Sequence, residues 1–192
     1  MTRLWWVRHG PTHEKCFTGW RDVPADLSDT ALIGRVADFL PTGAVIVASD
    51  LQRASATADA IGRDRQRLPD DPALREMHFG VWDGMHHTDV VARDPVLSRA
   101  FWESPGELRA PGGESWHDVS ARVARVVGDL VLRFAGRDIV LVAHMGVIMT
   151  QIQRAAGCTA YQAMGHQIDN LSVTQMTCYP TGWALGAVNH LP

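Results

Sequence analysis

Lysine is almost absent from this sequence. Of the 18 lysines and arginines among its 192 residues, only Lys15 is a lysine, which leaves 17 arginines. An anion site in this chain must therefore be built mainly from guanidinium groups, which bind phosphate oxygens in pairs. A formal net charge of −3 also argues against the basic field of a general nucleic-acid-binding protein. We expect no nucleic-acid partner.

Cysteine and long apolar runs are scarce as well. The three cysteines, at positions 16, 158 and 178, form no CxxC pair. Such an odd, sparse set fits reduced thiols in the cytoplasm better than a disulfide framework. No stretch approaches the roughly 20 apolar residues of a membrane span, and the run at residues 4–7 is too short for a signal peptide. We therefore expect a cytoplasmic protein without membrane association.

What the sequence does contain is an alternation of strand and helix patterns. Short apolar runs at residues 4–7, 45–48 and 139–143 predict buried strands. Helical spacing follows over residues 28–40, 51–63 and from 116 onward, where Ser115 and Asp118 form a capping box, and again after residue 144. Residues 171–179 and 183–188 read as a terminal hairpin.

This alternation predicts an α/β fold, specifically a three-layer α/β/α sandwich with a mostly parallel central sheet. The length suits a single domain over residues 1–192. Residues 84–113 are the least regular part, rich in proline and glycine, with one helix expected near 88–102. We expect this segment to form a lid or small cap.

Cationic and titratable side chains follow each of the three predicted strands. Arg8 and His9 come after the first, Arg53 lies one turn beyond the second, and His144 follows the third. The carboxyl ends of parallel strands meet at one edge of the sheet, where ligands bind. Arg53 also stands in the first turn of its helix, where the helix dipole disfavours a cation. These positions together indicate an anion site.

The Arg-His-Gly triplet at residues 8–10 resembles the mark of the histidine phosphatase superfamily, which has the phosphoglycerate mutase-like fold. The resemblance covers nearly the whole chain and rests on several motifs in order. These are FTGWRDV at residues 17–23, ASDLQRA at 48–54, LRE at 74–76 with FGVWDG at 79–84, PGGES at 111–115, VAHMG at 142–146 and NLS at 170–172.

The resemblance implies a role for each of these residues. His9 would be the nucleophile that forms a phosphohistidine, as neutral imidazole chemistry allows. Glu76 would give and take the proton of the leaving group, and Arg8, Arg53 and His144 would hold the phosphoryl oxygens. Further substrate-binding residues would be Lys15, Thr18, Gly19, Trp20 and Met145.

Two of these positions depart from the family pattern. Lys15 stands where an asparagine commonly helps to bind phosphate, and Met145 replaces a frequent glycine. Pro11 likewise replaces a usual glutamate or glutamine. No cofactor or metal ion is implied, and the histidines at 78, 86, 87 and 117 fit no zinc-ligand spacing.

The function that we expect is metal-independent hydrolysis of a small phosphorylated metabolite. A cofactor-dependent phosphoglycerate mutase is one alternative, although the chain lacks the longer arginine- and tyrosine-rich insertion of such mutases. A non-catalytic phosphate-binding regulatory module on the same fold is another. The sequence does not specify the substrate alcohol or the oligomeric state.

Overall fold

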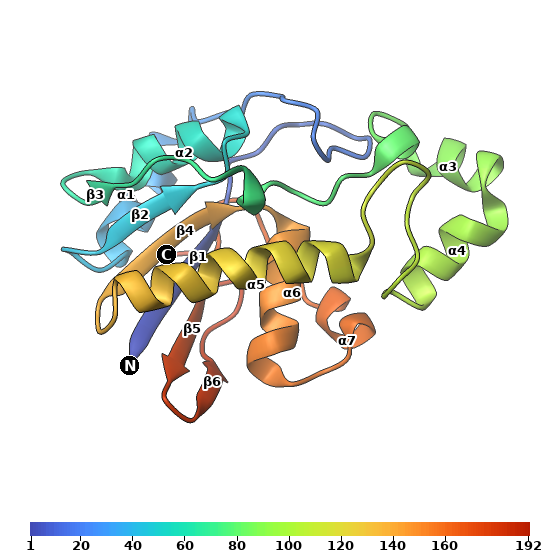
Figure 1. Ribbon diagram of the computed structural model, residues 1–192. Coiled ribbons are helices and arrows are strands. Elements are labelled where there is room, and N and C mark those ends of the chain that lie inside the picture. The colour runs from blue at the N-terminus through green and yellow to red at the C-terminus, as the bar shows by residue number, and fades with distance from the viewer.

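A six-stranded mixed sheet forms the centre of the computed structural model, which describes residues 1–192 (Figure 1). The strand order is β3-β2-β4-β1-β5-β6. The strands are β1 Thr2–Arg8, β2 Val45–Ala48, β3 Gln66–Arg67, β4 Asp138–Ala143, β5 Val173–Tyr179 and β6 Gly182–Leu185. The first four pair in parallel, and the hairpin of β5 and β6 extends β1 in the antiparallel sense. The predicted mostly parallel sheet is confirmed.

Helices cover both faces of this sheet. The helices are α1 Thr30–Phe39, α2 Gln52–Gly62, α3 His87–Arg93, α4 Pro95–Glu103, α5 Trp116–Arg133, α6 Met145–Ala156 and α7 Ala160–Met164, with short 3₁₀ turns η1 Pro72–Leu74 and η2 Gly80–Trp82. Helices α1 and α2 lie on one face, and α5 and α6 on the other (Figure 1). Helices on both faces of one sheet make the three-layer α/β/α sandwich that the sequence predicted.

Alternation along the strands explains the two layers. On β1, Leu4 and Trp6 belong to a core of 28 buried residues, whereas Val7 belongs to a second core of 15. On β4, Leu141 faces the first core and Val142 the second. Successive side chains of a strand point to opposite faces, so each strand supplies both cores. This burial fixes the register that brings the strand ends together.

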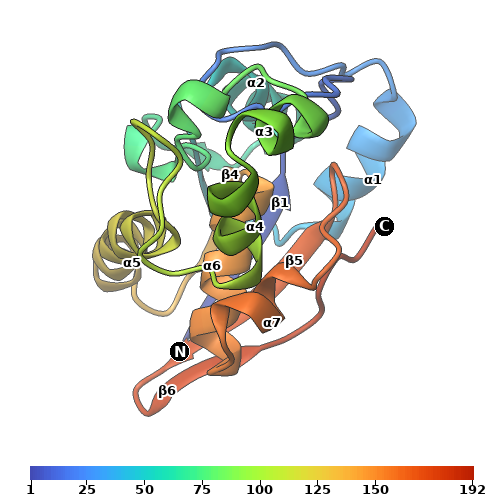
Figure 2. The same cartoon turned by 90° about the vertical axis from the view of Figure 1, so that its right-hand side faces the viewer.

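The segment at residues 84–113 holds two helices where the sequence predicted one, and its role as a lid or small cap stays a prediction. The helix expected near 88–102 is two helices, α3 and α4, which meet at Asp94. The break falls there because Pro95 has no N–H to continue α3 and instead takes the first position of α4. Both helices lie on the side toward which the parallel strands point (Figures 1 and 2). No helix is at once long enough and apolar enough to cross a membrane.

Candidate active site

Strand register places the two predicted catalytic histidines side by side. Strands β1 and β4 pair so that Arg8 lies opposite Ala143. His9 and His144, the residues that follow, therefore leave the sheet at the same edge, and their ring centroids are 5.0 Å apart. His144 also stands immediately before the first turn of α6. The sheet thus brings together the two histidines that the sequence pattern placed at this edge, and their catalytic roles stay a prediction.

The imidazole of His9 is held in one tautomer. Its Nδ1 lies 2.7 Å from the carbonyl oxygen of Gly10, and because a carbonyl only accepts, Nδ1 must carry the proton. The backbone is fixed too, since Asn170 Nδ2 donates to the His9 carbonyl at 2.8 Å. Burial, with the charge of Arg53 adding to it, lowers the pKa of His9 to about 3. At neutral pH, Nε2 therefore holds a free lone pair and can act as a nucleophile.

Two arginines bring partly unsatisfied donors to this histidine. Arg53 is 1% exposed, and its two terminal nitrogens donate to the carbonyls of Arg21 at 2.8 Å and Gly19 at 2.7 Å. Arg8 donates from Nη1 to the Ile168 carbonyl at 2.6 Å. In both residues Nε is buried and has no partner in the protein. Buried donors without partners are rare in folded proteins, so these fit a bound anion.

His144 completes this group of free donors. Its side chain is fully buried, and neither ring nitrogen has a hydrogen-bond partner. Burial, and then the neighbouring His9, holds the pKa of His144 well below its usual value. A neutral imidazole still carries one N–H, which suits it to donate to a phosphoryl oxygen without adding a charge.

The carboxylate of Glu76 lies beside the start of α6. Its Oε1 accepts from the Met77 N–H at 2.9 Å, and its Oε2 accepts from the Gly146 N–H at 3.1 Å. The side chain is 8% exposed. A Cβ at position 146 would stand 2.5 Å from Oε1, so only glycine lets the carboxylate approach the helix start. Glu76 is thereby fixed at the start of α6, the helix that directly follows His144.

The loop at residues 17–23 is held against the site by one carboxylate. Asp83 accepts the backbone N–H groups of Gly19, Trp20 and Arg21 at 2.9–3.1 Å. Gly19 packs so closely against the segment after η1 that a Cβ would stand 2.5 Å from the carbonyl oxygen of Met77. The Thr18 hydroxyl donates to the Cys16 carbonyl, just before the loop, at 3.1 Å. The Gly19 carbonyl accepts a hydrogen bond from Arg53 at 2.7 Å and so orients that guanidinium; contact of Gly19 with substrate stays a prediction.

The remaining predicted substrate-binding residues lie at the periphery. Lys15 is exposed and has no hydrogen-bond or ion-pair partner. Trp20 is 37% exposed, donates from Nε1 to the Glu76 carbonyl at 2.8 Å and lies 4.9 Å from the Arg75 guanidinium. Met145 is 40% exposed and borders an apolar pocket next to Glu76. Contact with substrate remains a prediction for all three, and for Thr18.

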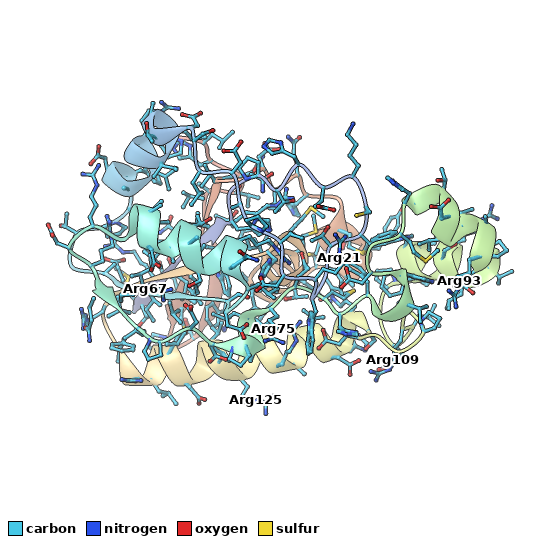
Figure 3. All side chains as sticks on the ribbon, turned by 90° about the horizontal axis from the view of Figure 1, so that it is seen from above. Arg21, Arg67, Arg75, Arg93, Arg109 and Arg125 are labelled. Carbon is cyan, nitrogen blue, oxygen red and sulfur yellow. The ribbon has the colours of Figure 1, made fainter.

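Sequence reasoning missed several residues that position the catalytic groups. Thr57 Oγ1 accepts from the Gly10 N–H at 3.0 Å and donates to the Arg53 carbonyl at 2.6 Å, which ties the two motifs together. Arg122 donates from Nη2 to the Glu76 carbonyl at 2.9 Å. Arg125, three residues further along α5, is exposed and points outward from the helix (Figure 3).

One signal for Arg122 was present in the sequence. The position lies next to Val123 and three residues after Val119, both on the apolar stripe of α5. An arginine at the edge of such a stripe must place its charge against other groups of the protein.

No cluster of metal ligands is present in the structure, since no group of three or more His, Cys, Asp or Glu side chains is placed to hold an ion. Metal independence itself remains a prediction.

Comparison with known proteins agrees with this site. Residues 4–191 match the histidine phosphatase superfamily (branch 1). A glucosyl-3-phosphoglycerate phosphatase of Mycolicibacterium vanbaalenii is 38% identical over 76% of this chain and 70% of its own length. The adenosylcobalamin/alpha-ribazole phosphatase of Escherichia coli is 32% identical over 85% of this chain and 83% of its own length. In three longer mycobacterial relatives the match spans 50% of the protein.

Solved structures show the same likeness. The Bacillus stearothermophilus YhfR structure superposes with a TM-score of 0.88 at 27% sequence identity, covering 98% of this chain and 96% of that one. A match of this extent takes in the sheet edge that carries Arg8, His9 and His144, and helix α2, which carries Arg53. This chain belongs to branch 1 of the histidine phosphatase superfamily and is an enzyme that hydrolyses phosphate esters.

Proposed function

We propose that this phosphatase hydrolyses monoesters of small alcohols in two steps through His9. In the first step, Nε2 of His9 attacks phosphorus and forms the N–P bond while the bond from phosphorus to the ester oxygen breaks. Glu76 gives its proton to the departing oxygen, so the alcohol leaves neutral and Glu76 becomes a carboxylate.

The second step returns the enzyme to its starting state. Water attacks the phosphohistidine and loses a proton to Glu76, the N–P bond breaks, and inorganic phosphate leaves. His9 recovers its free Nε2 lone pair and Glu76 its proton. Arg8, Arg53 and His144 bind the phosphoryl oxygens in both transition states, where charge stabilisation supplies most of the acceleration.

The observation that carries this proposal is the state of His9. The Gly10 carbonyl holds the Nδ1 proton at 2.7 Å, and burial keeps the ring neutral with a pKa of about 3. A nucleophile thus stands ready beside buried donors on Arg8, Arg53 and His144 that have no partner in the protein. A site that only bound phosphate would need the donors but not the fixed tautomer.

Phosphate release from a panel of esters tests this function. The panel holds sugar phosphates, phosphoglycerates, nucleotides and α-ribazole phosphate, each measured with and without EDTA. We expect turnover that EDTA leaves intact and that vanadate inhibits, because vanadate adopts the geometry of the transition state. His9→Ala should abolish turnover, and His86→Ala, at an exposed position, should not.

Three other results would contradict the proposal. Activity lost to EDTA and restored by magnesium or zinc would show metal-dependent chemistry. Transfer of the phosphoryl group to added phosphoglycerate in place of water would identify a mutase. Tight phosphate-ester binding without turnover would identify a regulatory module. The substrate is proposed to be a small molecule of the cytoplasm, and no nucleic-acid partner is expected.

A further inference from the structure

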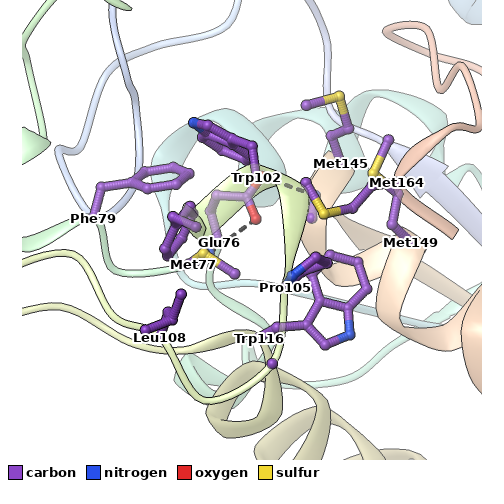
Figure 4. Close-up of a pocket in the computed structure, with 13 residues that line it drawn as sticks. Glu76, Met77, Phe79, Trp102, Pro105, Leu108, Trp116, Met145, Met149 and Met164 are labelled. Carbon is purple, nitrogen blue, oxygen red and sulfur yellow. Dashed lines mark hydrogen bonds between the residues drawn. The ribbon is translucent and has the colours of Figure 1, made fainter. Parts of the chain in front are cut away.

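An apolar pocket of about 280 Å³ opens beside Glu76 (Figure 4). Its walls come from the segment after η1, from α4 and the loop that follows it, and from α5, α6 and α7. The lining residues are Glu76, Met77, Phe79, Phe101, Trp102, Pro105, Gly106, Leu108, Trp116, Met145, Gly146, Met149 and Met164. Glu76 is the one ionisable residue among them, and no arginine, lysine or histidine takes part.

The pocket adjoins the candidate active site, with which it shares Glu76. Both carboxylate oxygens of Glu76 are bonded to backbone groups of pocket residues, namely the N–H groups of Met77 and Gly146. A proton donor must reach the ester oxygen, to which the alcohol carbon is attached. With Glu76 as the donor, the alcohol leaving a phosphoryl group at His9 would stand at Glu76, which lines this pocket together with Met145 and Gly146, the two residues after His144. This step rests on the proposed function, with Glu76 as the proton donor.

We propose that the preferred substrates are phosphate monoesters of apolar alcohols that carry an aromatic or branched aliphatic group. The walls suit such a group in two ways. Four methionines line the pocket, and their flexible thioethers adapt to apolar ligands of different shape. The aromatic side chains of the wall are held in place more rigidly than the methionines. Trp116 Nε1 donates to the Gln153 side chain at 2.6 Å, and the Phe101 ring packs edge-on against Trp102 with 4.8 Å between ring centroids.

The same walls disfavour charged and strongly polar alcohols. A carboxylate in the pocket would lose its hydration, find no cation among the lining residues and stand close to Glu76. The guanidinium of Arg122, which binds the Glu76 carbonyl, already uses its donors on backbone carbonyls and on Glu114. The hydroxyl groups of a sugar would likewise lack partners, and unpaired polar groups are costly to bury.

Kinetics on three alkyl esters test this preference. The esters are 2-phenylethyl phosphate, glycerol phosphate and 3-phosphoglycerate, all of which release an aliphatic alcohol. Enclosing a phenyl group in an apolar pocket should raise kcat/KM on the order of 10- to 100-fold over glycerol phosphate. We expect 3-phosphoglycerate to be the poorest of the three.

A charge placed in the wall gives a sharper test. Leu108 lines the pocket and is 37% exposed, so Leu108→Arg can fold and should lower the ratio of kcat/KM for phenylethyl phosphate over 3-phosphoglycerate at least ten-fold. Val96→Arg makes the same change at an 82% exposed position of α4 outside the pocket, and should leave the ratio unchanged. Met145→Arg serves as a second wall variant if Leu108→Arg does not fold.

The outcomes separate this inference from the function on which it rests. Equal kcat/KM for the three esters, or a ratio that a folded wall variant leaves unmoved, would overturn the apolar preference while leaving the phosphatase intact. Absence of turnover with every ester would overturn the proposed function itself and this inference with it.

Discussion

Replacing Arg122 should damage both stability and catalysis, because one guanidinium joins three segments around Glu76. Nε and Nη2 bind the Glu114 carboxylate at 2.8 and 2.9 Å, and Nη1 donates to the Ala73 and Arg75 carbonyls at 2.8 and 2.7 Å. With the bond from Nη2 to the Glu76 carbonyl, all five N–H groups of the guanidinium are used.

The size of the effect follows from what Arg122→Met leaves behind. The side chains of Arg122 and Glu114 are 12% and 19% exposed, so the carboxylate would remain largely buried without its cation. Loss of one partner of such a pair costs about 3 kcal/mol of unfolding free energy. The carbonyl of Glu76 also loses a donor, and a shift of about 1 Å in a catalytic group can cost on the order of 10²-fold in rate.

Urea unfolding and burst-phase phosphorylation measure these two effects separately. Adding Glu114→Gln to Arg122→Met should restore part of the stability, because the uncompensated charge is gone, but not the phosphorylation rate. Arg125→Met is the matched control, because Arg125 is an arginine of the same helix but is exposed. This variant should change the unfolding free energy by less than about 0.5 kcal/mol. A folded Arg122→Met enzyme that phosphorylates at the parent rate would refute the positioning of Glu76 by Arg122.

Two further predictions concern the catalytic groups. Glu76→Gln should slow phosphorylation by about 10²–10⁴-fold for alkyl esters but much less for nitrophenyl phosphate, whose leaving group needs little protonation. Arg53→Ala should slow phosphorylation by both kinds of ester alike, because both need the charge stabilisation. Equal losses with both kinds of ester in Glu76→Gln would exclude Glu76 as the proton donor. Burial lowers the pKa of His9 from 6.5 to about 3 in the folded state, so its contribution to stability is complete above pH 6.5 and is lost as pH falls toward 3. Acid titration of the unfolding free energy should therefore be shallower in His9→Gln, by up to about 1.4 kcal/mol per pH unit, and parallel curves would count against a buried neutral His9.

The sheet and its flanking helices could be predicted because their signals are local. The run at residues 45–48 is apolar without interruption, and β2 spans those residues. The capping box of Ser115 and Asp118 likewise marks the start of α5. The break between α3 and α4 was missed because the apolar spacing continues across Asp94, although Pro95 was a visible reason to expect it.

The candidate site likewise has a part that the sequence predicted and a part that it did not. His9 and His144 follow strands directly, so strand pairing alone brings them to one edge. The contacts that orient them are long-range and do not appear as sequence patterns. Thr57 and Arg122 each join segments that are distant in the chain. The pocket beside Glu76 could not be foreseen either, because its walls come from segments that only the tertiary fold brings together.

The covalent state of His9 during turnover tests the central claim most directly. The enzyme is mixed with a phosphate ester, quenched in alkali within the burst phase, digested and mapped by mass spectrometry. A phosphoryl group on His9 that is stable in base and lost in acid, absent in His9→Ala and retained in His86→Ala, is the predicted result. Undiminished labelling in His9→Ala, or a phosphoryl group on any other residue, would contradict the account.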